Sequence, residues 1–290
     1  MGFRESLKHL VIRIFSVVRQ RSSTQMQQVM VANQYRLMKK SMYPGEMPKL
    51  REVGFRVHSE FEEDGILLYI FSIIGTTNKR VVEICAGDGI QCMAANLIIN
   101  HGWNGLLFDG DDTYVNRGIR FYSSHMSTFY HPPIIKKAWV TRENVNQIIE
   151  ENGFKGEIDL LSVDIDGNDY HVMEAITVVR PRVIICETHN IIPSDLSLTI
   201  PYKSDFNRFN DLHPEFMGVS LLAMKKLLRS KGYRLIGGHQ YGFNAIFMLD
   251  EIGNDYFPEV SIQSIHDNPY TKFRRISAWA RVKDLPWIKI

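Results

Sequence analysis

The sequence is poor in cysteine, with only three among its 290 residues and none in a C-x-x-C spacing. An odd number of cysteines without that spacing excludes a disulfide framework and a zinc knuckle. All three, Cys85, Cys92 and Cys186, stand in apolar stretches of the chain. We therefore expect buried free thiols, which suit the reducing cytoplasm.

An excess of charge of one sign is also lacking, because 34 Lys and Arg oppose 32 Asp and Glu and leave a formal net charge of +2. Such a balance gives no overall positive field for phosphates, so a nucleic-acid partner is not expected. The hydrophobic content of 44% is that of an ordinary soluble protein, and the length suffices for one main domain with added segments.

The N-terminal region lacks an uninterrupted apolar run. Residues 7–18 are largely apolar, but Lys8 and Arg13 interrupt them, and the segment is too short to span a bilayer. Two interpretations stay open: a helix whose apolar face packs on the domain or a partner, and a helix that lies on a membrane surface. Residues 1–50 as a whole are predicted to form a helical extension, which could pack on a second subunit of a homo-oligomer.

Beyond this extension the chain alternates short β-rich runs with helical stretches, a pattern typical of an α/β fold with a parallel sheet. The last two runs are separated by a Gly-containing loop without a helix, so they should form an antiparallel hairpin. The predicted strands are 80–85, 105–108, 134–140, 158–163, 183–186, 233–236 and 244–249, and the predicted helices are 61–74, 91–100, 144–151, 170–178 and 220–230.

Five parallel strands followed by such a hairpin resemble the seven-stranded, Rossmann-like sheet of class I methyltransferases. We assign this main domain to residues 51–250. Within it, residues 190–218 lack periodicity and contain three prolines, which predicts a substrate or lid loop. The aromatic-rich tail, residues 251–290, is expected to pack on the domain.

A Gly-rich turn follows the first predicted strand, in the sequence Glu83-Ile-Cys-Ala-Gly-Asp-Gly89. Glycine lets the backbone turn sharply and lets a ligand lie against it near the start of the next helix. The turn resembles the methyltransferase motif E-x-G-x-G-x-G, with Cys85 in place of the first Gly. It predicts that Glu83, Gly87, Asp88 and Gly89 bind S-adenosylmethionine, with Glu83 facing the methionine end; a plain strand-to-helix turn is the alternative.

The second predicted strand ends in Asp109-Gly110-Asp111, some twenty residues after the turn. An acidic residue at this place can accept both ribose hydroxyls of a nucleotide, and Asp109 is the better candidate. Asp111 could instead cap the following turn. A nicotinamide cofactor would need a third Gly, but Cys92 stands at that position.

Two more predicted strands also end in acidic residues. Asp164, Asp166 and Asp169 follow one strand, and a metal ion, a substrate or a Lys could relieve their mutual repulsion. The alternative assigns Asp166 to a turn and Asp169 to a helix N-cap. Glu187 and His189 follow the next strand and should face Asp164 and Asp166, so they could bind a metal or supply a general base.

Together these stretches resemble the FkbM-type methyltransferase family, whose members carry D-x-[ED]-G-x-[ED] and E-x-H after the fourth and fifth strands. Here those motifs start at Asp164 and Glu187. The resemblance implies S-adenosylmethionine as methyl donor and a hydroxyl on a sugar or natural product as acceptor. Similar sugar O-methyltransferases use Mg²⁺ held by carboxylates, which implies a divalent cation on Asp164, Asp166 and Glu187.

Two mechanisms stay open at this point: His189 takes the acceptor's proton, or the cation on Asp164 and its neighbours lowers the pKa of the acceptor hydroxyl. The cofactor site should also include Gly110, Asp111 and Asp164 at the strand ends, and Ala138 and Trp139 after the third predicted strand. Candidate acceptor-binding side chains lie in the irregular segment: Tyr202, Lys203, Phe206, Arg208, Phe209 and His213. The rival functions are a non-catalytic binding module and a different nucleotide-dependent enzyme on the same scaffold.

Overall fold

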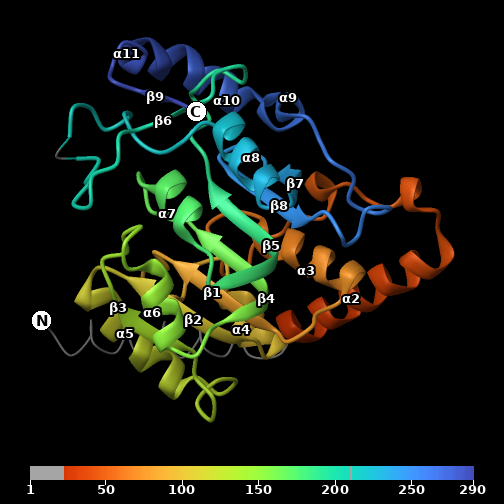
Figure 1. Ribbon diagram of the computed structural model, residues 1–290. Helices are drawn as coiled ribbons and strands as arrows, with labels where there is room; N and C mark the ends of the chain where they lie inside the picture. Colours follow the sequence, from red (N-terminus) through yellow and green to blue (C-terminus); the bar gives the residue numbers. More distant parts are fainter. Residues whose placement is uncertain (1–22, 210) are drawn as a thin grey trace, which may run out of the picture.

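The computed structural model describes residues 23–209 and 211–290 and is built around a twisted seven-stranded sheet (Figure 1). The strand order is β3-β2-β1-β4-β5-β8-β7. The strands of this sheet are Arg80–Ile84 (β1), Asn104–Asp109 (β2), Ile134–Lys137 (β3), Gly156–Val163 (β4), Val179–Glu187 (β5), Tyr233–Gly238 (β7) and Asn244–Leu249 (β8).

The pairing of the strands confirms the predicted class I methyltransferase sheet. Strands β1 to β5 are mutually parallel, while β8 runs antiparallel between β5 and β7. Buried apolar residues run through both faces of the central strands, as in sheets covered by helices on both sides. The carboxyl ends of the five parallel strands therefore meet at one edge, where open α/β sheets bind their ligands.

Helices cover both faces of the sheet (Figure 1). One face is covered by Ser23–Ser41 (α2), Glu63–Ile74 (α3), Ala95–His101 (α4) and Asp112–Ser124 (α5), and the other by Val145–Glu151 (α6), Asp169–Ala175 (α7) and Leu221–Ser230 (α8). The sequence-based prediction lacked α5, because this helix buries only the narrow stripe of Val115, Gly118 and Tyr122. Asp111 caps α5 by accepting hydrogen bonds from Thr113 and Tyr114.

The irregular segment 190–218 and the C-terminal tail pack on each other. They share a small hydrophobic cluster that includes Ile200, Phe216, Val282 and Trp287. A short sheet of Leu198–Thr199 (β6) and Ile288–Lys289 (β9) joins them. The remaining elements are Pro44–Glu46 (η1), Leu50–Glu52 (η2), Ile262–His266 (α9), Pro269–Arg274 (α10), Arg275–Trp279 (η3) and Ala280–Val282 (α11).

The predicted burial of the three cysteines is confirmed for two of them. Cys92 and Cys186 are buried as predicted, but Cys85 is exposed, because it lies on the wall of the cavity described below. The apolar segment 7–18 lies outside the described residues. None of the described helices is long and apolar enough to cross a membrane.

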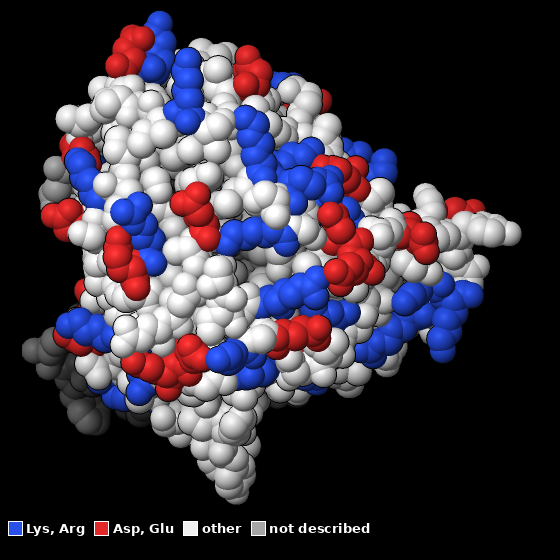
Figure 2. All heavy atoms as spheres, in the orientation of Figure 1, with Lys and Arg blue, Asp and Glu red and all other residues white. Residues whose placement is uncertain are grey.

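On the face shown in Figure 2, Lys and Arg side chains lie interspersed with Asp and Glu.

A buried ion pair ties β4 to β5 at the end of the sheet opposite the ligand edge. Asp159 is fully buried and accepts hydrogen bonds from the amides of Thr77, Asn78 and Lys79. Arg182 donates to the same carboxylate at 2.8 Å. Burial alone would raise the pKa of Asp159, but Arg182 and the three amides lower it.

We expect Asp159→Ala to lower the free energy of unfolding by about 3–5 kcal/mol, because Arg182 would stay buried without its partner. Urea denaturation measures this change. The matched control is Glu251→Ala, which breaks the exposed ion pair with Arg180 and should change stability by less than about 1 kcal/mol. Equal losses of unfolding free energy in the two variants would show that the buried ion pair of Asp159 stabilises the fold no more than an exposed one does.

Candidate active site

The Gly-rich turn after β1 adopts an unusual backbone. Cys85, Gly87 and Gly89 have φ values of 65°, 57° and 68°, in the left-handed region. A residue with a side chain pays about 1–2 kcal/mol for this conformation. The conformation of Cys85 therefore explains why the corresponding position of the methyltransferase motif is usually Gly.

The two glycines of the turn have different surroundings. A Cβ added to Gly87 would meet no heavy atom within 4 Å, whereas one added to Gly89 would lie 2.9 Å from Leu107 Cδ1. Gly87 thus borders open space at the ligand edge of the sheet, and Gly89 permits close packing of the turn on β2. Next to them, Asp88 forms an ion pair with Arg117 at 3.3 Å and caps the amide of Ile90.

Asp109 connects the turn to the end of β2. Its Oδ2 accepts a hydrogen bond from the Gly87 amide at 2.8 Å, and its Oδ1 accepts one from the Asp111 amide at 2.8 Å. The side chain is largely buried, and burial raises the pKa of Asp109. Each carboxylate oxygen has a second lone pair, so Asp109 can still accept hydrogen bonds from a ligand.

Glu83 lies beneath the turn. It is 4% exposed, and its two oxygens accept hydrogen bonds from the amides of Met93 at 2.9 Å and Ala94 at 2.7 Å. These amides belong to the start of α4, where a carboxylate is favoured. The sequence analysis predicted that this carboxylate faces the cofactor. In the structure, its hydrogen bonds to the Met93 and Ala94 amides hold the start of α4 against β1.

A cavity opens beside the turn at the carboxyl ends of β1, β2 and β4. Among the predicted cofactor residues, Asp109, Gly110, Ala138 and Trp139 line it, and the Trp139 ring packs on Gly110. The opposite wall comes from the irregular segment. The full lining is Ile84, Cys85, Asp109, Gly110, Ala138, Trp139, Val140, Ile165, Asp166, Asn168, Phe206, Asn207, Arg208 and Phe209.

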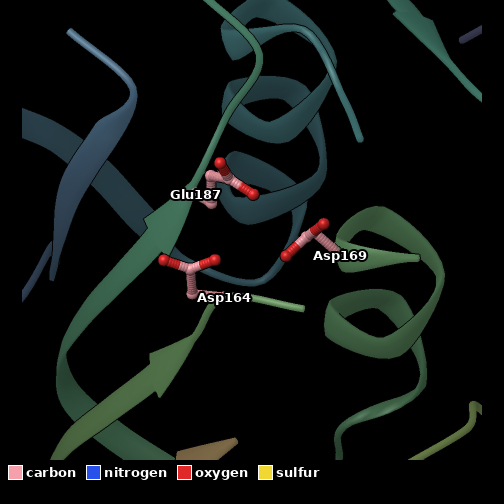
Figure 3. Close-up of side chains that lie close together, drawn as sticks. All are labelled: Asp164, Asp169 and Glu187. Atoms are coloured by element: carbon pink, nitrogen blue, oxygen red, sulfur yellow. The ribbon is translucent and has the colours of Figure 1, made fainter. Parts of the chain in front are cut away.

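Three carboxylates converge next to this cavity (Figure 3). Asp164 follows β4, Asp169 starts α7, and Glu187 ends β5. One oxygen of each lies within 4.8 Å of the others. We call these three residues the acidic group.

The acidic group is electrostatically strained. Burial and the neighbouring carboxylates raise the pKa of Asp164 and of Glu187 well above their usual values. Burial also raises the pKa of Asp169 to about 6, although the amides of Ile165 and Gly167 donate hydrogen bonds to it. Glu187 Oε2 is buried and has no hydrogen-bond partner among the described residues. The group therefore suits a bound cation, or protons shared among its members.

The acidic group differs from the metal-binding set predicted from the sequence, because Asp169 belongs to it and Asp166 does not. Asp166 has a positive φ of 54°, and its exposed side chain forms an ion pair with Arg208. The sequence showed three acidic residues after β4 but did not show the path of the turn that carries them. The amides of Ile165 and Gly167 fix that path by binding Asp169.

His189 lies behind the strand end rather than in the acidic group. It is 8% exposed, and its Nε2 is 2.9 Å from the backbone oxygen of Glu215. A carbonyl only accepts, so Nε2 carries the hydrogen and the ring's lone pair is on Nδ1. Burial lowers the pKa of His189 to about 4.

Of the six predicted acceptor-binding residues, Phe206, Arg208 and Phe209 line the cavity. Tyr202 donates a hydrogen bond to Glu143, Lys203 forms an ion pair with Asp211 at 2.6 Å, and His213 accepts from the Glu215 amide. The sequence missed the neighbouring wall residues Asn168 and Asn207. Their only signal was their place beside Gly167 and Arg208 in the sequence.

Comparison with solved structures finds distant likenesses. The chain is 14% identical to the N-terminal domain of EvdMO1 determined in the presence of SAH and D-fucose, over 73% of this chain and 94% of that one, with a TM-score of 0.42. It is 12% identical to a putative caffeoyl-CoA O-methyltransferase from Staphylococcus aureus, over 82% and 97% of the two chains, with a TM-score of 0.41. Likenesses this distant support no statement about activity.

No curated protein matches the chain. A family model does match, with the description "Methyltransferase FkbM domain", over residues 117–235. This range runs from α5 to β7 and contains both acidic motifs, after β4 and after β5. This match is consistent with the strand order of the sheet and with the Gly-rich turn, which lies before the matched residues. Residues 117–235 therefore match the methyltransferase FkbM domain, and the strand order of the sheet is that of a class I methyltransferase.

Proposed function

We propose that this chain is an S-adenosylmethionine-dependent methyltransferase that acts on a hydroxyl of a small molecule, a sugar or a similar hydroxyl-rich compound, with the help of a divalent cation. The observation that carries this proposal is the acidic group, which lies beside the cavity at the carboxyl ends of β4 and β5. Methyl transfer to an alcohol requires loss of the alcohol's proton, and the acidic group is the feature of this edge that can assist it.

The methyl donor is proposed to lie between the Gly-rich turn and the cavity. Gly87 leaves open space for its methionine part, and Asp109 is placed to accept hydrogen bonds from the ribose. Gly110, Ala138 and Trp139 line the remaining wall. When bound, S-adenosylmethionine supplies an electrophilic methyl group. The protein's contribution is to hold the acceptor in line with that methyl, which can supply most of the rate.

The acidic group fits a hard divalent cation such as Mg²⁺, because its donors are all carboxylate oxygens. Asp164, Asp169 and Glu187 would hold the ion, and the unpartnered Glu187 Oε2 supports this assignment. A bound cation would lower the pKa of the acceptor hydroxyl. The positive charge of Arg208, whose ion pair is with Asp166, also lowers the pKa of Glu187, but burial and the neighbouring carboxylates outweigh it.

We expect Mg²⁺ to raise the melting temperature of the protein by about 5 °C at a hundredfold excess over its Kd, which corresponds to about 2.7 kcal/mol of stabilisation. Differential scanning fluorimetry in MgCl₂ and in EDTA measures the shift. In Asp164→Asn the shift should vanish, while the variant in EDTA melts above the wild type because one repelling charge is gone. Equal Mg²⁺ shifts in both proteins would contradict the cation site.

We propose that His189 holds the backbone at Glu215 in place and does not take the acceptor's proton. A pKa near 4 makes it a weak base at neutral pH. His189→Gln keeps a donor for the Glu215 carbonyl and removes the imidazole. We expect it to lower kcat less than about tenfold, as measured by the release of adenosylhomocysteine. A loss of about 10²–10⁴-fold, typical of a removed general base, would restore the imidazole as the base.

A further inference from the structure

The helical part of the C-terminal tail has a charge pattern unlike the rest of the chain. Helices α10, η3 and α11 follow one another without a break from Pro269 to Val282, beyond the end of the sheet to which β5 points (Figure 1). Residues 268–283 contain five basic side chains and no Asp or Glu. The basic residues are Lys272, Arg274, Arg275, Arg281 and Lys283. We call residues 269–282 the C-terminal helix.

The inner face of the C-terminal helix is packed on the domain. Ala278 and Val282 are fully buried in the small hydrophobic cluster that the tail shares with the irregular segment. Thr271 is also fully buried, and its Oγ1 donates a hydrogen bond to the Tyr241 carbonyl at 2.9 Å. One side of the helix therefore has a structural role in the fold.

Two arginines fix the C-terminal helix to the segment that follows β5. Arg274 forms an ion pair with Glu215 at 2.6 Å. Arg275 donates hydrogen bonds to the carbonyls of Asn190 and Ile192, both at 3.1 Å. The helix is thus attached at the same end of the sheet as the candidate active site.

The outer face of the C-terminal helix is apolar and faces water. Phe273 is 67% exposed, Ile276 is 82% exposed, and Tyr270 and Ala280 are exposed as well. Spacings of three, three and four residues place these side chains on one side of a helix. Phe273 and Ile276 belong to none of the three hydrophobic clusters of the described residues. An apolar stripe that the fold leaves uncovered is typical of an interaction surface.

Basic side chains flank this stripe and are poorly neutralised. Lys283 forms no ion pair among the described residues, and Lys272 has only an exposed pair with Asp267. Arg281 lies 3.9 Å from Glu215, a carboxylate that already pairs with Arg274. An apolar stripe flanked by Lys and Arg is the pattern of helices that lie in the plane of a membrane surface.

We propose that the outer face of the C-terminal helix binds an anionic lipid surface. Tyr270, Phe273 and Ile276 would enter the boundary between headgroups and acyl chains, while Lys272 and Lys283 contact the anionic headgroups. Binding in this way turns toward the lipid the side of the molecule to which β5 points.

The charges and the size of the face favour lipid over the other occupants. A second copy of this face would bring like charges together, since residues 268–283 carry no acidic side chain. A stable protein interface takes about 20–30 residues a side, far more than one stripe of a short helix offers. Nucleic acid would need basic side chains where the stripe has Phe273 and Ile276.

The test measures co-sedimentation of the full chain with vesicles of phosphatidylcholine, alone or mixed with about one third of phosphatidylglycerol. We expect binding to the anionic vesicles, and loss of that binding at high salt. Phe273→Ser/Ile276→Ser should weaken it by about tenfold or more, because two apolar side chains no longer leave water. Lys272→Gln/Lys283→Gln should also weaken it and should reduce its salt dependence.

The matched control is Met126→Ser/Tyr130→Ser, which removes two side chains that are 67% and 90% exposed on the loop after α5. This control should bind vesicles like the wild type. All the substituted side chains are exposed, so thermal melts should show that each variant keeps its fold.

Three results would overturn the inference. The first is a wild type that does not bind anionic vesicles, and the second is equal binding by the wild type and Phe273→Ser/Ile276→Ser. The third is a wild-type dimer in sedimentation velocity that Phe273→Ser/Ile276→Ser converts to a monomer without a change in vesicle binding, because the face would then belong to a second copy. None of these measurements depends on methyl transfer, so the lipid surface and the proposed function are tested separately.

Discussion

Asp164→Asn is expected to lower methyl transfer to the acceptor by at least about 10³-fold while leaving adenosylhomocysteine bound. Asp164 directly precedes Ile165 and Asp166, which line the cavity. Its removal takes away one cation ligand and one carboxylate beside the acceptor. Turnover is measured by mass spectrometry of the methylated product, and cofactor affinity by calorimetry.

Glu187→Gln and Asp169→Asn should cause losses of the same order, because each removes a carboxylate from the same group. Asp166→Asn is the informative comparison. Its side chain is exposed and paired with Arg208, so we expect a loss smaller than about tenfold. If Asp166→Asn were inactive and Asp169→Asn active, the cation set inferred from the sequence would be right and the one inferred from the structure wrong.

Gly87→Val is expected to weaken the binding of adenosylhomocysteine by at least about 100-fold, with a loss of turnover that follows from it. The space beside Gly87 is open, so a valine side chain would occupy the path that the cofactor's methionine part is proposed to take. A β-branched residue at a φ of 57° also strains the turn by about 1–3 kcal/mol. Calorimetric titration measures the affinity.

Gly102→Val separates strain from obstruction. Gly102 has a φ of 65° after α4, and a Cβ there also meets nothing within 4 Å. Both variants should therefore lose similar stability, but only Gly87→Val should lose affinity for the cofactor. Unchanged affinity in Gly87→Val would remove the Gly-rich turn from the cofactor site.

The sheet could be predicted from the sequence because its strands are short apolar runs between recognisable helices and turns. The absence of a helix between the last two runs was enough to predict the antiparallel hairpin of β7 and β8, which the structure contains. Helix α5 was missed for a physical reason. It lies on the surface, and one of its three buried residues is Gly118, a residue type that disfavours helix in the sequence.

The sequence was enough to predict which strand ends meet at the candidate site, but not which way every side chain there points. Parallel strands bring Asp109, Asp164 and Glu187 to one edge whatever the turns do, and the register of β1, β2, β4 and β5 places them there. Which way a side chain points after the strand has ended depends on turn geometry. The positive φ of Asp166 directs that carboxylate to Arg208, while backbone amides hold Asp169 in the acidic group.

The rest of the candidate site comes from segments without helical or strand periodicity, so its arrangement could not be predicted from the sequence. The sequence marked residues 190–218 as a loop, but nothing in it indicated that Phe206 packs within reach of Gly167 or that the C-terminal tail would join it in a small sheet.

A crystal structure grown with adenosylhomocysteine and Mn²⁺ tests the central claim most directly, since Mn²⁺ takes the oxygen ligands of Mg²⁺ and scatters anomalously. We predict density for the nucleoside against Asp109 and Trp139, with the homocysteine part passing Gly87. An anomalous peak should lie among Asp164, Asp169 and Glu187. A nucleoside bound elsewhere, or a peak at Asp166 with none in the acidic group, would contradict the account.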